Sequence, residues 1–323
     1  MIYPKFVKKG DLIGICAPSA GIGHKLEDHL VSIKTLKNNG FKVKETKSVR
    51  VNNKRSTTAK NRAKELDQLV CDKNVKAILT ATGGDYMMEV VPHINFENIK
   101  NNVKWMGGMS DPTNLLFLTT TNLDIATFYG HNSASLVEND KAKETFISYM
   151  KGDIKKQNSY KKYQTFIETI NDVKEYKHDV KWMSSKNQVI EGRLIGGCLD
   201  VISKLIGTKY DHVNEFIDKY SDDGIVWYFD IFGLDGYNTY LTLLQLKYAG
   251  WFRHCKGILI GRVAFENEND MKYADAYSKA LGKIPYIYEM DLGHTYNGMT
   301  LINGALCKAT YKDHKGSISF KLK

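Results

Sequence analysis

The feature that most limits the fold is the alternation of apolar runs with helical patterns over the first half of the chain. Apolar runs near residues 12–17, 75–80 and 103–108 predict strands, and the alternation of apolar and polar residues at 41–45 predicts another. Helical patterns cover about 25–39 and 57–71, and Pro112 opens a further apolar helix. Alternation of this kind predicts an α/β domain with a largely parallel sheet covered on both faces, of the Rossmann or flavodoxin-like type.

The length and the later pattern indicate two domains. At 323 residues the chain exceeds the usual size of one domain. Apolar runs return at 193–197, 225–229 and 257–261, with a helix at about 236–249, after a polar stretch rich in Tyr and Lys. We therefore expect an N-terminal domain at 1–140, a connecting segment at 141–188 and a β-rich α/β domain at 189–323.

Composition excludes several classes of protein. The formal charge of +10 comes from 46 basic residues that are interleaved with acids, without a zinc-finger, RNA-binding or helix-turn-helix signature, so we expect a solvated surface rather than a nucleic-acid partner. The alternative is a patch that attracts anionic ligands. The N-terminus has no long apolar run, which predicts no membrane association and a cytoplasmic location. No cluster of His, Cys or carboxylates indicates a metal site.

Ser110 is the first candidate for chemistry. It lies in Gly107-Gly108-Met109-Ser110-Asp111-Pro112, at the junction of an apolar run with a helix. A serine at such a junction projects from the carboxyl edge of a sheet, beside helix amides that can stabilise an oxyanion. The alternative is a serine that only caps the helix.

Two further segments lie at expected strand ends. Thr82-Gly83-Gly84-Asp85 offers backbone amides to a ligand, or forms only a tight turn. His294 lies in a loop between Gly293 and Gly298, where it is placed to act as a base. An exposed loop histidine without a role is the alternative.

Five segments resemble the LD-carboxypeptidase family, also called peptidase family S66. They are GDLIGICAPSAG, TGGDYMMEVVPHINFENIKNN, GGMSDPTNLL, EGRLIGGCLDVISKLIGTKYD and LGHTYNGMTLINGA, in family order over nearly the whole chain. The resemblance implies a serine-type carboxypeptidase without a cofactor, and a homodimer. It also implies Ser110 as the nucleophile, His294 as its base, and the amides of Gly84 and Asp111 as the oxyanion hole. Gly83 is implied in substrate binding.

The acid of the triad departs from the family pattern. The family has a Glu at the end of the strand in GIVWYFDIFG, where this chain has Asp230, one methylene shorter. Asp orients the imidazole in many triads, so we expect Asp230 to complete a Ser-His-acid triad. Asp235 and Asp291 are weaker alternatives.

The substrate stays open between two branches of the family. One removes D-alanine from murein tetrapeptides, and the other, the microcin C self-immunity branch, cleaves a peptidyl- or aminoacyl-nucleotide. The length and the connecting segment look more like the second branch. Trp182 resembles the tryptophan that stacks on the nucleotide base there, and a buried anchor is the alternative. The alternative to an enzyme is a ligand-binding member of this scaffold with impaired catalysis.

Overall fold

The computed structural model describes residues 1–136, 141–170, 176–266, 270–295 and 297–323. It separates the chain into two compact units. Unit 1 contains Met1–Ile154 and Thr300–Gly304, and unit 2 contains Lys155–Met299 and Ala305–Lys323. None of the helices in the described ranges is both long and apolar enough to cross a bilayer.

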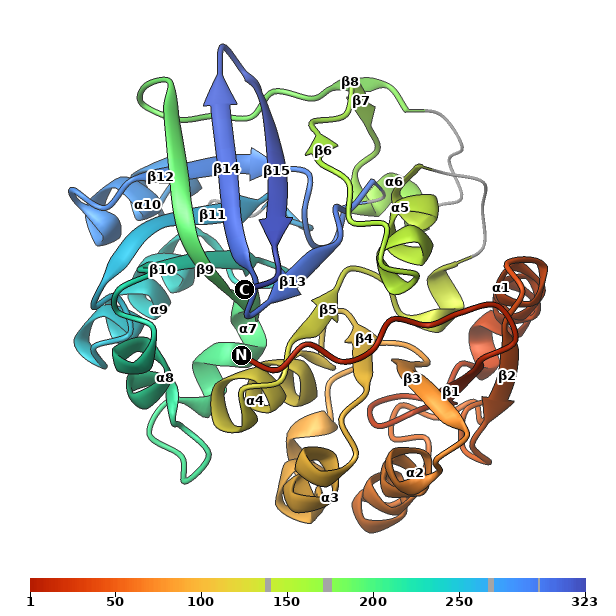
Figure 1. The fold of residues 1–323 in the computed structure, drawn as a ribbon. Helices are drawn as coiled ribbons and strands as arrows, with labels where there is room; N and C mark the ends of the chain where they lie inside the picture. The colour runs from red at the N-terminus through yellow and green to blue at the C-terminus, as the bar shows by residue number, and fades with distance from the viewer. Residues whose placement is uncertain (137–140, 171–175, 267–269, 296) are drawn as a thin grey trace. The chain divides into compact units, whose positions relative to one another are not determined.

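Unit 1 is built on the parallel sheet that the sequence predicts (Figure 1). In spatial order its strands are β13 (Leu301–Asn303), β5 (Thr127–Tyr129), β4 (Trp105–Gly108), β3 (Val75–Thr80), β1 (Leu12–Cys16) and β2 (Lys42–Glu45). All neighbours pair in parallel except β13, which runs antiparallel to β5. The active edge of such a sheet is expected at the carboxyl ends of its parallel strands.

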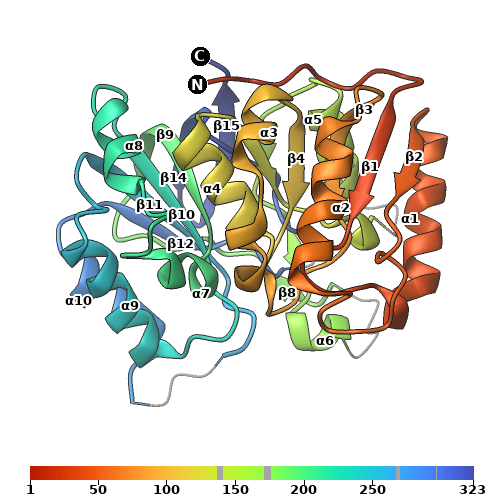
Figure 2. The same ribbon diagram turned by 90° about the horizontal axis from the view of Figure 1, so that it is seen from below.

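Helices cover both faces of this sheet. They are α1 (Leu26–Asn38), α2 (Ala59–Cys71), α3 (Phe96–Asn101), α4 (Thr113–Leu123) and α5 (Lys141–Met150). Figure 2 shows α2, α3 and α4 in succession along one side. On β5, Thr127 contacts the backbone of α4 at Leu116, whereas the next side chain, Phe128, packs on Phe146 of α5. Alternate side chains of a strand point to opposite faces, so α4 and α5 cover opposite sides of the sheet.

Four short 3₁₀ turns also lie in the described part of unit 1. They are η1 (Gly23–Lys25), η2 (Met87–Glu89), η3 (Val91–His93) and η4 (Ser133–Ser135).

Unit 2 is a mixed α/β unit around a seven-stranded sheet (Figure 1). Its strands, in spatial order, are β12 (Tyr286–Met290), β11 (Cys255–Gly261), β10 (Ile225–Asp230), β9 (Gln188–Cys198), β14 (Leu306–Lys312), β15 (Lys315–Lys321) and β6 (Gln157–Asn158). The first four are parallel, and β14, β15 and β6 add antiparallel pairs. This is the β-rich second domain that the sequence predicts.

The remaining elements of unit 2 are helices and one small ribbon. The helices are α6 (Phe166–Ile170), α7 (Leu199–Ile202), η5 (Ser203–Leu205), α8 (Val213–Lys219), α9 (Gly236–Tyr248) and α10 (Tyr273–Leu281). The ribbon pairs β7 (Lys162–Tyr163) with β8 (His178–Asp179). Every side chain of β10 is buried, which fixes the position of Asp230 at its end.

The boundaries of the units differ from the expected domains. The expected connecting segment, 141–188, is divided: α5 belongs to unit 1, and β6 extends the sheet of unit 2. The chain also returns to unit 1 for β13 before it resumes in β14. The polar composition of 141–188 concealed these elements, because α5 buries only one face and β6 is a short edge strand.

Candidate active site

Ser110 has a left-handed backbone, with a φ of 71°. It lies two residues after the end of β4 and precedes α4, and the Thr113 N–H donates to the Ser110 C=O at 2.8 Å. A positive φ is costly for a residue with a side chain, so the surrounding contacts must hold it. A strained serine on a sharp strand-to-helix turn is the geometry of a nucleophile elbow.

Asn132, in the loop that follows β5, holds this turn. Its side-chain amide donates to the Met109 C=O and accepts from the Met109 N–H, both at 3.1 Å. The Thr80 hydroxyl at the end of β3 donates to the same amide oxygen at 2.6 Å. These contacts replace strand pairing just before Ser110. No local pattern indicated Asn132, because the backbone that it contacts is 23 positions away in the sequence.

Gly83 and Gly84 lie beside the serine in unit 1. A β-carbon on Gly83 would be 3.0 Å from the Ser110 Cβ and 3.1 Å from its Oγ. Gly84 has a φ of 147°, and a β-carbon there would overlap the Ser19 hydroxyl. Among the described residues, no acceptor receives the Gly84 N–H. The glycine pair therefore lets the backbone approach Ser110 closely.

Asp111 uses its side chain for structure. The carboxylate is buried and accepts from the Ser19 hydroxyl, from the Met87 N–H at 2.8 Å and from the Asn114 side chain at 3.1 Å. Its backbone N–H lies at the start of α4, where helix amides favour negative charge.

His294 and Asp230 meet in unit 2. The Asp230 Oδ2 lies 2.8 Å from the His294 Nδ1, an ion-pair distance, although the carboxylate is off the direction of the ring N–H. The Asp230 Oδ1 accepts from the His294 N–H at 3.0 Å. Both residues are buried, and Asp230 ends β10 as the sequence predicts. The shorter acid thus reaches the imidazole.

Two aromatic rings surround this histidine. The Phe232 ring is tilted over the imidazole with centroids 4.4 Å apart, and Phe166 approaches it edge-on at 5.7 Å. The loop that carries Phe232 is held by Asp200, whose carboxylate accepts the N–H groups of residues 232, 233 and 234 at 2.7–3.1 Å. Asp200 ends the segment EGRLIGGCLD, whose local pattern indicates no role for it.

Cys198 pairs with Asp230 across β9 and β10. Burial raises the pKa of the Cys198 thiol well above its usual range, and the nearby Asp230 charge raises it further. The thiol is therefore neutral beside the carboxylate, so it adds no second negative charge to this part of unit 2.

The two alternative acids have other partners. Asp235 is the N-cap of α9 and accepts from the Asn238 N–H at 2.7 Å. Asp291 is buried against the Arg262 guanidinium, with which it forms an ion pair. Neither contacts His294, so Asp230 is the acid that the structure brings to the imidazole.

Trp182 does not present its ring for stacking. Its side chain is fully buried in unit 2, and its Nε1–H donates to Asp291 at 2.9 Å. A β-carbon on Gly316 would overlap its ring. The base-stacking interpretation is corrected on this point, because a ring enclosed on both faces has no surface for a nucleotide.

Tyr296, in the histidine loop, lies outside the described residues.

The chain matches two family models that together cover most of its length. Residues 13–130 match the LD-carboxypeptidase N-terminal domain, and residues 191–309 match the LD-carboxypeptidase C-terminal domain. The first match contains Ser110 and the glycine pair, and the second contains Asp230 and His294.

Two relatives and one solved structure illustrate the likeness. The microcin C7 self-immunity protein MccF of Escherichia coli is 28% identical, with 62% of each chain covered. A probable murein peptide carboxypeptidase of Bacillus subtilis is 28% identical, over 80% of this chain and 73% of that protein. The structure of MccF in complex with glutamyl sulfamoyl guanosine superposes with a TM-score of 0.83, at 21% identity and 98% coverage of both chains.

Proposed function

The chain belongs to the LD-carboxypeptidase family of serine peptidases, and we propose that it hydrolyses an amide bond with Ser110, His294 and Asp230 as its triad. The left-handed Ser110 between β4 and α4 is the observation that carries the proposal. A serine that only caps a helix adopts an ordinary extended backbone and needs no strained turn. A strained turn at the carboxyl edge of a parallel sheet is instead typical of an exposed nucleophile.

The residues divide the reaction between the two units. Ser110 attacks the carbonyl carbon while His294 removes its proton, and Asp230 stabilises the imidazolium that forms. The amides of Gly84 and Asp111 receive the developing oxyanion. His294 then protonates the leaving amine, and water releases the acyl group from Ser110. The proposal requires Ser110 and His294 to come within hydrogen-bond reach during turnover.

The substrate is a small peptide or a peptidyl-nucleotide. The two curated relatives named above represent both branches at equal identity, so they do not separate the branches. The burial of Trp182 removes the residue that favoured the nucleotide branch in the sequence. A panel of a murein tetrapeptide and an aminoacyl sulfamoyl adenosine distinguishes them. The homodimer and the cytoplasmic location stay predictions.

Reaction with a fluorophosphonate tests the proposal. The wild type should become covalently labelled, Ser110→Ala should not, and Ser278→Ala, which removes an exposed serine hydroxyl from α10, should label like the wild type. Labelling that persists in Ser110→Ala would remove Ser110 as the nucleophile. A wild type that stays unlabelled but binds a panel substrate would favour the non-catalytic ligand-binding protein.

A further inference from the structure

Two loops of unit 1 lie directly against each other beside Ser110. We call them the β1 loop (residues 17–21) and the β3 loop (residues 81–86), after the strands that they follow. The Ala20 N–H donates to the Gly83 C=O at 3.2 Å, and Gly84 rests on Ser19 so closely that a β-carbon would overlap the Ser19 hydroxyl. The position of the Gly84 amide therefore depends on the β1 loop.

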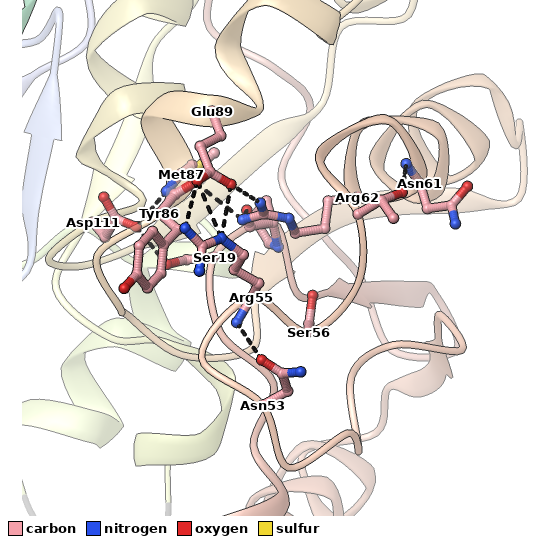
Figure 3. A network of polar contacts seen from close by, with 12 residues as sticks. Ser19, Asn53, Arg55, Ser56, Asn61, Arg62, Tyr86, Met87, Glu89 and Asp111 are labelled. Carbon is pink, nitrogen blue, oxygen red and sulfur yellow. Dashed lines mark hydrogen bonds and ion pairs between the residues drawn. The ribbon is translucent and has the colours of Figure 1, made fainter.

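The Asp111 carboxylate connects these loops with the nucleophile turn (Figure 3). One of its oxygens, Oδ2, accepts both the Ser19 hydroxyl and the Met87 N–H, the latter at 2.8 Å. Ser19 has no exposed surface, and Asp111 is 4% exposed. A buried carboxylate with charged-group hydrogen bonds is a strong and directional connection. One side chain thus joins the segments that follow β1, β3 and β4.

Arg62 of α2 connects the same loops from another direction. Its Nη1 donates to the Pro18 C=O at 3.2 Å and to the Tyr86 C=O at 3.1 Å, and its Nη2 contacts Glu89 at 2.9 Å (Figure 3). The guanidinium is buried, and these acceptors compensate its two Nη groups for the loss of water, whereas its Nε has no hydrogen-bond partner among the described residues. Asp111 and Arg62 together hold the β1 loop at residues 18–19 and the backbone that follows the glycine pair at residues 86–87.

We propose that Ser19 is a positioning residue for the oxyanion hole, acting through Asp111 and Gly84. The inference rests on the proposed function, in which those two residues supply the amides of the hole. The Ser19 hydroxyl fixes the β1 loop to the Asp111 carboxylate, and the Ser19 side chain supports the Gly84 turn. Donors stabilise an oxyanion only when they are held in place before the charge develops. Without the hydroxyl, Met87 and Asn114 still contact Asp111, but the β1 loop is no longer tied to it.

The test compares two serine-to-alanine variants that affect the same loop. Ser19→Ala removes the hydroxyl that reaches Asp111. Ser56→Ala is the matched control, because the Ser56 hydroxyl is also buried and donates to the β1 loop, at the Ala17 C=O over 2.8 Å, without touching Gly84 or Asp111. A fluorophosphonate is the probe, since its phosphoryl oxygen occupies the oxyanion hole when Ser110 attacks.

The expected result separates positioning from general support. Ser19→Ala should lower the maximal labelling rate by about 10- to 100-fold, somewhat less than the loss of a whole oxyanion donor. The fluorophosphonate concentration that gives half the maximal rate should change less than about threefold. The affinity for phenylboronic acid, measured as protection of Ser110 from labelling, should fall by the same factor as the maximal labelling rate. Ser56→Ala should stay within about threefold of the wild type in all three values.

The outcomes that overturn the inference differ from those that overturn the proposed function. The positioning role alone is rejected if Ser19→Ala labels at the wild-type rate. It is also rejected if both variants lose labelling rate equally and have lower melting temperatures. A wild type that does not label rejects the proposed function and the inference with it. If Ser19→Ala does not fold, Ser19→Cys carries the test, with an intermediate loss expected because a thiol is a weak donor.

Discussion

Gly293 and Asp230 fit together so closely that only a glycine is possible beside the carboxylate. A β-carbon on Gly293 would overlap the Asp230 side chain, and the glycine has a φ of 82°. This fit allows the Asp230 Oδ1 to receive the His294 N–H while Oδ2 contacts the ring. Asp230 is one methylene shorter than the Glu of the family pattern, and it reaches His294 because the backbone at Gly293 lies close to its carboxylate.

Gly293→Ala should lower kcat about 100-fold, because a displacement of roughly 1 Å at a catalytic group has that effect. The measurement is steady-state kinetics on the panel substrate that the wild type cleaves. Gly298→Ala in the same loop is the control, since its β-carbon would only approach two carbonyl oxygens at 3.2 and 3.4 Å. Equal losses in both variants would contradict a specific role for the Gly293–Asp230 fit.

Asp230→Asn should lower kcat by about 10²- to 10⁴-fold with little change in melting temperature, because an amide no longer stabilises the imidazolium. Asp235→Asn makes the same chemical change at the N-cap of α9, where Asn caps as well as Asp, and should leave both values near those of the wild type. Wild-type turnover in Asp230→Asn would assign the acid of the triad to another residue.

Trp182→Ala should lower the free energy of unfolding by about 3–5 kcal/mol, as expected for deletion of a fully buried aromatic side chain. Activity toward a murein tetrapeptide and toward an aminoacyl nucleotide should fall together. Trp182→Phe, which keeps a ring but loses the hydrogen bond to Asp291, should cost less, about 1–3 kcal/mol. A loss confined to the nucleotide substrate, without a change in stability, would restore the stacking role.

His131 should make stability depend on pH. Burial, with a smaller contribution from Lys143, lowers the pKa of His131 to about 4 from its ordinary value of 6.5. Below pH 6.5 the unfolded chain binds a proton at His131 that the folded protein does not bind until the pH falls to about 4. The contribution of neutral His131 to the free energy of unfolding is therefore fully present above pH 6.5 and is lost as the pH falls toward 4. Urea unfolding of the wild type should show this decline relative to His131→Gln. Parallel pH profiles of the two proteins would contradict it.

The sequence predicted the parts of the fold whose patterns are local. The buried strands β1, β3, β4, β10 and β11 follow continuous apolar runs, and α1 and α9 end near the glycines that marked them. The strand at 193–197 is part of the longer β9, whose first half alternates in burial and pairs with β14. Strand register and edge pairing depend on distant residues, so they were not visible in the sequence.

The site was predictable only in part, for the same reason. Local patterns indicated Ser110, the glycine pair and His294 only as candidates, and the family resemblance implied Asp230 and the role of each residue. The residues that hold them have no local signature: Ser19 acts on a carboxylate 92 positions away. Trp182 was ambiguous, because burial of a tryptophan on a polar segment is decided by the strands that pack around it.

We propose that Ser110 of unit 1 and His294 of unit 2 take part in one proton-transfer step. The most direct test is kcat/KM for Ser110→Ala, His294→Ala and the double variant, with folding checked by circular dichroism. Each single variant should lose several orders of magnitude, and the double variant should be scarcely slower than either, because triad members act as a unit. Losses that multiply in the double variant would contradict the shared step.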